Sequence, residues 1–190
     1  MPQGSKTVET DALLSELDML RHDVSAGDIV VGAAYGISGY QAVRWATHIA
    51  QARGRRLQIV RVVREVEWLL DPRPLEELIA AGDRLGRNVL TDYAGIARSV
   101  ASEVEIRTRL LRGSIYTELV RETAAAGLLV VGAGDDCQPV VAGDRAPRPV
   151  ADWFTEHAPC PVLVVDRHGH NARDDNCAHT EDSIARYGEG

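Results

Sequence analysis

The sequence DIVVGAAYGISGYQAVRWA, residues 28–46, joins a short apolar strand to an amphipathic helix. Its first part, Asp28–Gly32, is apolar at every position between its two ends, which is typical of a strand that helices cover on both faces. The helix begins near Ser38 or Gly39, carries apolar residues at helical spacing and is predicted to end at Gly54. This segment therefore predicts one strand–helix unit of a parallel sheet.

The same alternation of strands and helices continues as far as residue 167. A long helix is predicted after the Asp71–Pro74 loop, a shorter one between Ser114 and Gly127, and a last one that ends near His157. The further strands are predicted at Leu57–Val63, Val104–Leu110, Leu128–Gly132 and Val162–Val165. Because such strands pair in parallel through right-handed crossovers, the sequence predicts an α/β fold: a doubly wound, five-stranded parallel sheet with helices on both faces.

The two ends of the chain differ in composition from this domain, which we place at residues 27–167. Residues 1–26 are polar apart from a leucine stripe over residues 13–20, which predicts an N-terminal arm with a short amphipathic helix. The stripe could pack on the domain itself, on a second copy of the chain or on a foreign partner. Residues 168–190 contain too few large apolar residues to offset their ordering entropy, so we expect a disordered polar tail.

Charge and cysteine content limit the classes of partner and compartment. The formal net charge of the 190 residues is -7, which disfavours binding to nucleic acid or to an anionic membrane surface. The basic cluster Arg53–Arg56 falls where a helix should end, and cations there interact favourably with the helix dipole.

Three cysteines cannot all pair and match no zinc-site spacing, which favours a reducing compartment. Since no signal peptide or membrane-spanning run is evident, we expect a cytoplasmic protein.

Two of the buried strands end in the same residues, Val-Val-Gly-Ala, at 30–33 and at 130–133. Parallel sheets of this kind bind ligands beyond the carboxyl ends of their strands, where the strand order reverses. A glycine at such a strand end lets a ligand or another backbone approach closely. We therefore expect both strand ends to form one ligand crevice. Its predicted lining is Ala33, Ala34, Tyr35, Gly132, Ala133, Gly134 and Asp135.

Four segments of the sequence resemble the universal stress protein family. They are the segment quoted above, GRRLQIVRVV at 54–63, RGSIYTELVRETAAAGLLVVGAG at 112–134 and HAPCPVLVV at 157–165. Together they span about residues 28–166. The resemblance implies an adenine-nucleotide alpha-hydrolase-like sheet in the strand order 3-2-1-4-5, in which the first and fourth strands are neighbours at the switch point. It also implies a homodimer formed through the last strand.

The family contains members that bind ATP and members that do not, and this sequence departs from the pattern of the binders. The binders resemble G-x-x-G followed nine residues later by G-[ST], with an aspartate just after the first strand. Here Asp135 stands at the second glycine, residues 145–146 (Arg-Ala) stand where G-[ST] should be, and Ala34 replaces the aspartate. Asp136 and Asp144 add negative charge to the same loop, and two like charges ~4 Å apart repel by roughly 4 kcal/mol at an effective dielectric of about 20. We therefore expect no tight ATP binding and no required cofactor.

The two edges of the predicted sheet differ in charge. The strand Val104–Leu110 is interrupted by Glu105, Arg107 and Arg109, whereas the last strand carries no charge. An uncharged edge strand exposes N–H and C=O groups with which another strand can pair. We therefore expect a homodimer around a two-fold axis, unless the N-terminal arm covers this edge. The predicted dimer edge consists of Val162, Leu163, Val164 and Val165.

No group of residues predicts catalysis or a metal site. The tail contains an H-x-H and a C-x-H pattern, formed by His168, His170, Cys177 and His179. These are soft ligand types, but incidental residues in a polar tail are the simpler interpretation. Cys160, between two prolines, is interpreted as a packed structural thiol, and Cys137, beside two aspartates that disfavour its thiolate, as unreactive.

Together these observations favour a universal-stress-type domain that is not an enzyme. It would act in the stress response by forming a homodimer and by binding a small ligand or a protein partner. The alternative is an ATP-binding member of the family with weak hydrolase or nucleotide-sensing activity.

Overall fold

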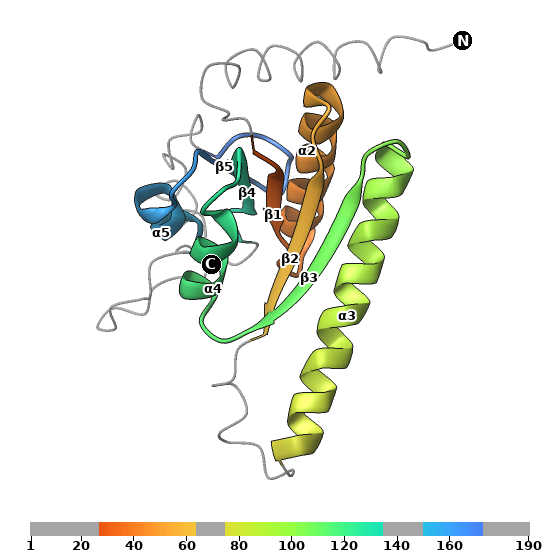
Figure 1. The fold of residues 1–190 in the computed structure, drawn as a ribbon, viewed down its shortest axis with the longest axis vertical. Coiled ribbons are helices and arrows are strands. Elements are labelled where there is room, and N and C mark those ends of the chain that lie inside the picture. Colours follow the sequence, from red (N-terminus) through yellow and green to blue (C-terminus); the bar gives the residue numbers. More distant parts are fainter. Residues whose placement is uncertain (1–26, 64–74, 135–149, 173–190) are drawn as a thin grey trace, which may run out of the picture.

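The computed structural model describes residues 27–63, 75–134 and 150–172. These residues form a five-stranded, all-parallel sheet in the order β3-β2-β1-β4-β5 (Figure 1). The strands are β1 (Ile29–Gly32), β2 (Leu57–Val63), β3 (Ile106–Arg112), β4 (Leu128–Gly132) and β5 (Val162–Val165). The helices are α2 (Ile37–Arg53), α3 (Leu75–Val100), α4 (Ile115–Thr123) and α5 (Val150–His157). The predicted fold class and strand order are confirmed.

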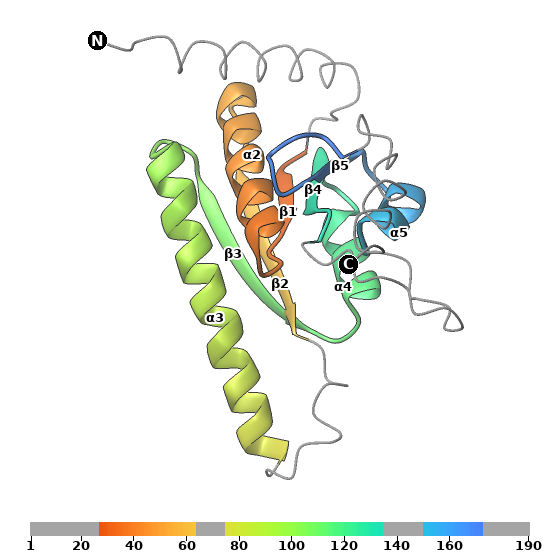
Figure 2. The ribbon, with the colours of Figure 1, turned by 180° about the vertical axis from the view of Figure 1, so that it is seen from behind.

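Alternate side chains of the sheet enter two separate hydrophobic cores. Ile29 and Val31 of β1 pack in the core that α2 and α3 cover, whereas Val30 between them packs in the core under α4 and α5. Figures 1 and 2 show the two helix pairs on opposite faces of the sheet. Because both faces are covered, the inner strands β1 and β4 are apolar at almost every position, as the sequence predicts.

Both bounds of β3, which ends at Arg112 instead of Leu110, and the end of α4 differ from those predicted. The strand predicted from Val104 begins at Ile106, since Val104 still belongs to a turn in which its N–H donates to the carbonyl of Ala101. Pairing with the first residue of β2, rather than the apolar alternation, sets the start of β3. Ser114 occupies the N-cap position of α4 in extended conformation but makes no side-chain cap bond, and α4 ends at Thr123, before the predicted glycine.

The domain extends beyond the boundary expected at residue 167. Residues 166–172, here called the C-terminal turn, fold back along the outer edge of β5. Val165 and Asn171 form an antiparallel bridge, and the N–H of Ala172 donates to the carbonyl of Val164 at 2.8 Å. The rest of the expected tail and the expected N-terminal arm lie outside the described residues.

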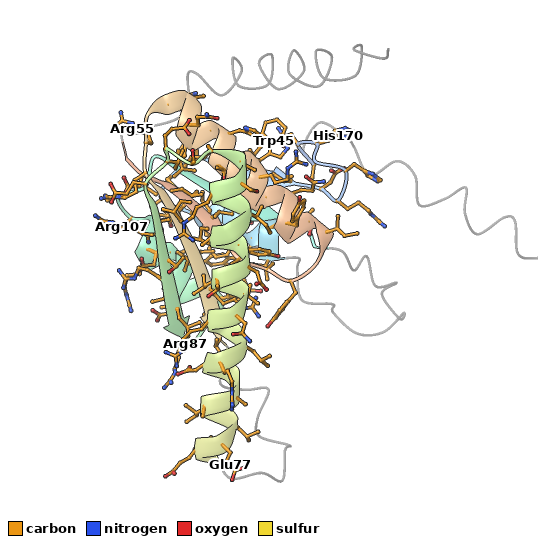
Figure 3. All side chains as sticks on the ribbon, turned by 90° about the vertical axis from the view of Figure 1, so that its right-hand side faces the viewer. Trp45, Arg55, Glu77, Arg87, Arg107 and His170 are labelled. Atoms are coloured by element: carbon orange, nitrogen blue, oxygen red, sulfur yellow. The ribbon has the colours of Figure 1, made fainter. Side chains whose placement is uncertain are left out.

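The C-terminal turn also contacts α2. The carbonyl of Gly169, which has a φ of 81°, accepts a hydrogen bond from the indole Nε1 of Trp45 at 2.6 Å. One carboxylate oxygen of Asp166 accepts the backbone N–H groups of His168 and His170, each at 2.8 Å. Figure 3 shows Trp45 and His170 close together where the turn passes α2. These contacts explain why a polar stretch adopts one conformation.

Within the described ranges, every helix is too short or too polar to span a lipid bilayer.

Alanine substitution at two helical glycines, one in the first turn of α2 and one in α3, should have opposite effects on the free energy of unfolding. A methyl group at Gly39 would lie 2.2 Å from the carbonyl oxygen of Ala34, whereas one at Gly95 of α3 would meet no atom within 4 Å. We expect Gly39→Ala to lower the free energy of unfolding by about 1–3 kcal/mol through overpacking. Gly95→Ala should raise it by about 0.5–1 kcal/mol, because alanine loses less conformational entropy in a helix. Urea unfolding of both variants measures these changes, and equal effects at the two sites would contradict the close docking of α2.

Candidate functional site

The carboxyl ends of β1 and β4 lie side by side, where the strand order reverses. The register pairs Val31 with Val130, so the chain leaves both strands at the same level of the sheet. This brings together residues 33–36 and 132–134, which we call the switch-point site. All the predicted crevice residues belong to it except Asp135, which lies outside the described residues.

The turn after β1 is held by donors from β2 and α3. The N–H of Ala33 donates to the carbonyl of Val60 at 2.7 Å, and the carbonyl of Ala33 accepts from Nη1 of Arg61 at 2.8 Å. The next carbonyl, that of Ala34, accepts from the hydroxyl of Tyr93 at 2.5 Å. Because these partners come from two other elements, the turn conformation depends on the tertiary fold.

A guanidinium lies on the aromatic ring of this turn. The Cζ atom of Arg61 is 4.3 Å from the ring centroid of Tyr35, a cation–π distance. Tyr35 is nonetheless 56% exposed. The Nε atom of Arg61 is buried and has no hydrogen-bond partner within the described part of the chain. Arg61 is therefore a charged member of the site with unused hydrogen-bonding capacity.

The glycine at the end of β4 accommodates a helix rather than a ligand. A methyl group at Gly132 would lie 2.8 Å from the carbonyl carbon of Ser38 and 2.9 Å from its Oγ, and Ser38 itself is fully buried. The predicted close approach is therefore real, but the backbone that approaches is the first turn of α2. Gly134, with a φ of 92°, is exposed, and a methyl group there would meet no atom of the described residues within 4 Å.

Sequence reasoning missed two residues of the site, Arg61 and Tyr93. Arg61 carries a signal, because it is the one charged residue in the otherwise apolar or neutral strand β2. A charge inside a strand that is covered on both faces requires a local partner, and the nearest carbonyl supplies it. Tyr93 carries no such signal, since an aromatic residue in the apolar stripe of a helix is ordinary core.

The residues considered for metal or thiol chemistry are only partly described. The rings of His168 and His170 lie 6.3 Å apart, and no group of three or more His, Cys, Asp or Glu side chains that could hold a metal is present among the residues that the structure places. Cys160 is half-buried, and burial raises the pKa of its thiol, which agrees with a packed, unreactive cysteine. The remaining candidates, Cys137, Cys177 and His179, lie outside the described residues.

The outer edge of β5, the predicted dimer edge, is partly covered by the C-terminal turn. The carbonyls of Pro161 and Val165 accept hydrogen bonds from the β4 side, so by alternation the backbone groups of Val162 and Val164 point away from the sheet. The carbonyl of Val164 is taken by Ala172. Within the described residues, the N–H and C=O of Val162 are left open to another strand.

Comparisons with known proteins agree with this architecture. The model of the universal stress protein family matches residues 27–166. The chain is similar to the solved structure of universal stress protein UspA from Lactobacillus plantarum, with 20% sequence identity and a TM-score of 0.57, over 73% of this chain and 96% of that chain. The chain has no match among curated proteins.

Two further similar structures contain nucleotides. One is a universal stress protein in complex with cAMP, with 25% identity and a TM-score of 0.54, over 77% of this chain and 99% of that chain. The other is the universal stress protein from Archaeoglobus fulgidus in complex with dAMP, with 20% identity and a TM-score of 0.50, over 73% of this chain and 96% of that chain.

The hydroxyl of Tyr93 provides a test of how firmly the turn is held. We expect Tyr93→Phe to lower the free energy of unfolding by about 1–2 kcal/mol, because the carbonyl of Ala34 loses its donor. Tyr116→Phe is the matched control: Tyr116 packs on Trp153 at 4.8 Å, and its hydroxyl makes no hydrogen bond within the described residues. That variant should stay within about 0.5 kcal/mol of the parent chain. If both variants unfold like the parent in urea, the hydroxyl does not hold the turn.

Proposed function

Because the chain belongs to the universal stress protein family, we propose that it is a non-enzymatic member that binds a small ligand or a protein partner at the switch-point site, without tight ATP binding. We further propose that it acts in the stress response as a homodimer in the cytoplasm.

The residue content of the switch-point site carries this proposal. Its described residues are alanines, glycines and Tyr35, and among the residues that the structure places, the guanidinium of Arg61 bonds to it. Acid–base or nucleophilic catalysis needs a carboxylate, histidine, cysteine or activated hydroxyl beside the reacting atom. Of the hydroxyls at the site, that of Tyr93 donates to the carbonyl of Ala34, and that of Ser38 is fully buried against Gly132. Such a site supports binding better than chemistry.

The same residues argue against tight ATP binding. Ala34 has no carboxylate, so its side chain cannot accept a hydrogen bond from a ribose hydroxyl. Its backbone carbonyl already accepts a hydrogen bond from Tyr93. The sequence after β4 contains Asp135, Asp136 and Asp144, which lie outside the described residues and whose charges would oppose a triphosphate. The residues present therefore do not fit ATP.

A second candidate is nucleotide sensing, with or without weak hydrolysis. The observation that favours it is the presence of cAMP and dAMP in two structures of similar fold. Both are monophosphates, which carry less negative charge than ATP. The two candidates differ in whether the protein retains a nucleotide on purification.

Self-association through β5 follows from the open backbone groups of Val162 together with the apolar character of the strand. The C-terminal turn limits pairing to the first half of the edge. The proposal of cytoplasmic action is supported by the three cysteines, which cannot all pair and suit a reducing compartment.

The nucleotide prediction is that Mg-ATP binds with a dissociation constant in the millimolar range or not at all. Titration calorimetry on the full chain measures this, and acid extraction followed by mass spectrometry detects any nucleotide that copurifies. A dissociation constant of ~1 μM, equivalent to about -8 kcal/mol, would exclude the proposed function and favour the nucleotide-sensing alternative.

The dimer prediction is best tested at Val162, because Leu163, Val164 and Val165 are buried in the cores and their substitution would unfold the chain. Val162→Lys places a charge on the half-buried edge position and should convert the dimer into a monomer. Val162→Thr, which keeps the shape and adds no charge, should leave the dimer intact. Light scattering after size exclusion gives the mass, and a parent chain that is monomeric at high micromolar concentration would refute the dimer.

A further inference from the structure

Arg61 differs in its partners from six of the thirteen arginines among the described residues. Six arginines there form ion pairs with carboxylates: Arg56 with Asp28, Arg87 and Arg112 with Asp83, Arg107 with Glu105, Arg109 with Glu122 and Arg121 with Glu118. Arg61 has no carboxylate partner within the described residues, although it reaches the switch-point site. Within the described part of the chain, the charge of Arg61 is therefore not paired with a carboxylate.

The hydrogen bonds of Arg61 leave one edge of its guanidinium unused. Nη1 donates to the carbonyl of Ala33, whereas Nε is buried without an acceptor. A buried donor without a partner destabilises the fold, so an acceptor that reaches it gains binding free energy. The Nε–H and the adjacent Nη2–H point in parallel, and this pair of donors matches the two oxygens of a carboxylate or a phosphate.

An exposed aromatic surface lies beside this edge. Tyr35, Ile37 and Tyr40 are 56%, 59% and 39% exposed, and all three belong to the turn after β1 or to the start of α2. Tyr35 packs one side of its ring on Arg61, at 4.3 Å, and much of the ring remains in solvent. Exposed apolar side chains that gather in one place mark binding sites. A planar group is the shape that packs best on a tyrosine ring.

Backbone and charge also favour an anion here. The N-terminal end of α2 packs on the end of β4, and the first turn of this helix contains no acidic residue. The positive end of the helix dipole therefore reinforces Arg61. Since the sheet order is β2-β1-β4, Arg61 lies on the opposite side of β1 from β4. Asp135 and Asp136, which follow β4 in the sequence, lie outside the described residues.

We propose that the switch-point site binds a small, planar organic anion, whose carboxylate or phosphate group is held by the Nε/Nη2 edge of Arg61 and whose ring packs on Tyr35. Because Nε is buried, binding requires a side-chain displacement, and Tyr35, whose exposed ring lies against the guanidinium, is the side chain that we propose to move. This inference rests on the proposed function, because it names the class of ligand for the same site. Arg61 is the residue that selects the anion, and Tyr35 the residue that selects a planar ring.

The test is a titration of the full 15N-labelled chain followed by NMR, with benzoate and phenyl phosphate as probes. We expect the Nε–H resonance of Arg61 and the amide resonances of Ala33, Ala34 and Tyr35 to shift with either probe, and not with benzyl alcohol, which keeps the ring and lacks the charge. Comparison of benzoate with phenyl phosphate shows which oxyanion the site prefers. Inorganic phosphate should bind more weakly than phenyl phosphate, because it lacks the ring.

Three variants separate the two roles. Arg61→Gln, which keeps a donor but loses the charge and the parallel edge, should weaken probe binding by about tenfold or more. Arg61→Lys keeps the charge but not the paired donors, so its loss of affinity for the probes should be smaller than that of Arg61→Gln. Tyr35→Leu should weaken the binding of phenyl phosphate and leave the binding of inorganic phosphate unchanged. Arg107→Gln removes an exposed arginine of β3 and is the matched control, with expected binding within about twofold of the parent.

Two results would overturn this inference. One is the absence of any shift at Arg61 Nε–H with both probes at millimolar concentration. The other is a site that binds the probes equally well in the parent chain and in Arg61→Gln. Either result leaves the proposed function standing if Mg-ATP also fails to bind, whereas micromolar ATP binding excludes the proposed function whatever the probes do. The thermal melting of each variant, recorded alongside, shows whether a loss of binding is a loss of fold.

Discussion

The close approach of α2 to the carboxyl ends of β1 and β4 is the constraint on which the rest of the site depends. Gly39 lies against the carbonyl of Ala34 and Gly132 lies against Ser38, and neither position has room for a side chain. With the helix fixed at this distance, the turn between β1 and α2 has one path, and its carbonyls face β2 and α3. Arg61 and Tyr93 then find acceptors at hydrogen-bond distance. The position of the charged group in the site is therefore a consequence of helix docking.

Local patterns in the sequence were sufficient to predict the fold class, whereas the strand order came from the resemblance to the family. Apolar runs such as Leu128–Gly132 indicate strands covered on both faces, and the alternation with helices restricts the topology to a parallel, doubly wound sheet. Gly54, in left-handed conformation, ends α2 where predicted. The start of β3 was wrong by two residues because strand pairing, which depends on the neighbouring strand, decides it. Periodicity contains no information about a neighbour that is distant in the sequence.

The candidate site was predicted less completely, for a related reason. The bonds that define it join Arg61 to Ala33, 28 residues apart, and Tyr93 to Ala34, 59 residues apart. A bond from a side chain to a distant carbonyl leaves no periodic trace in a sequence. The C-terminal turn shows the same limit. The prediction of disorder from residue 168 considered only the small number of large apolar residues. Backbone hydrogen bonds and the bond from Trp45 to Gly169, which that prediction did not consider, order the turn.

A fold shared with nucleotide-binding proteins does not fix the ligand, because recognition depends on the side chains placed at the strand ends. In the described part of this chain the positive charge lies on the β2 side of β1, at Arg61. A guanidinium at the strand ends attracts an anion. The ligand that we propose for this site therefore depends on two side chains of this sequence, Arg61 and Tyr35, and not on the fold alone.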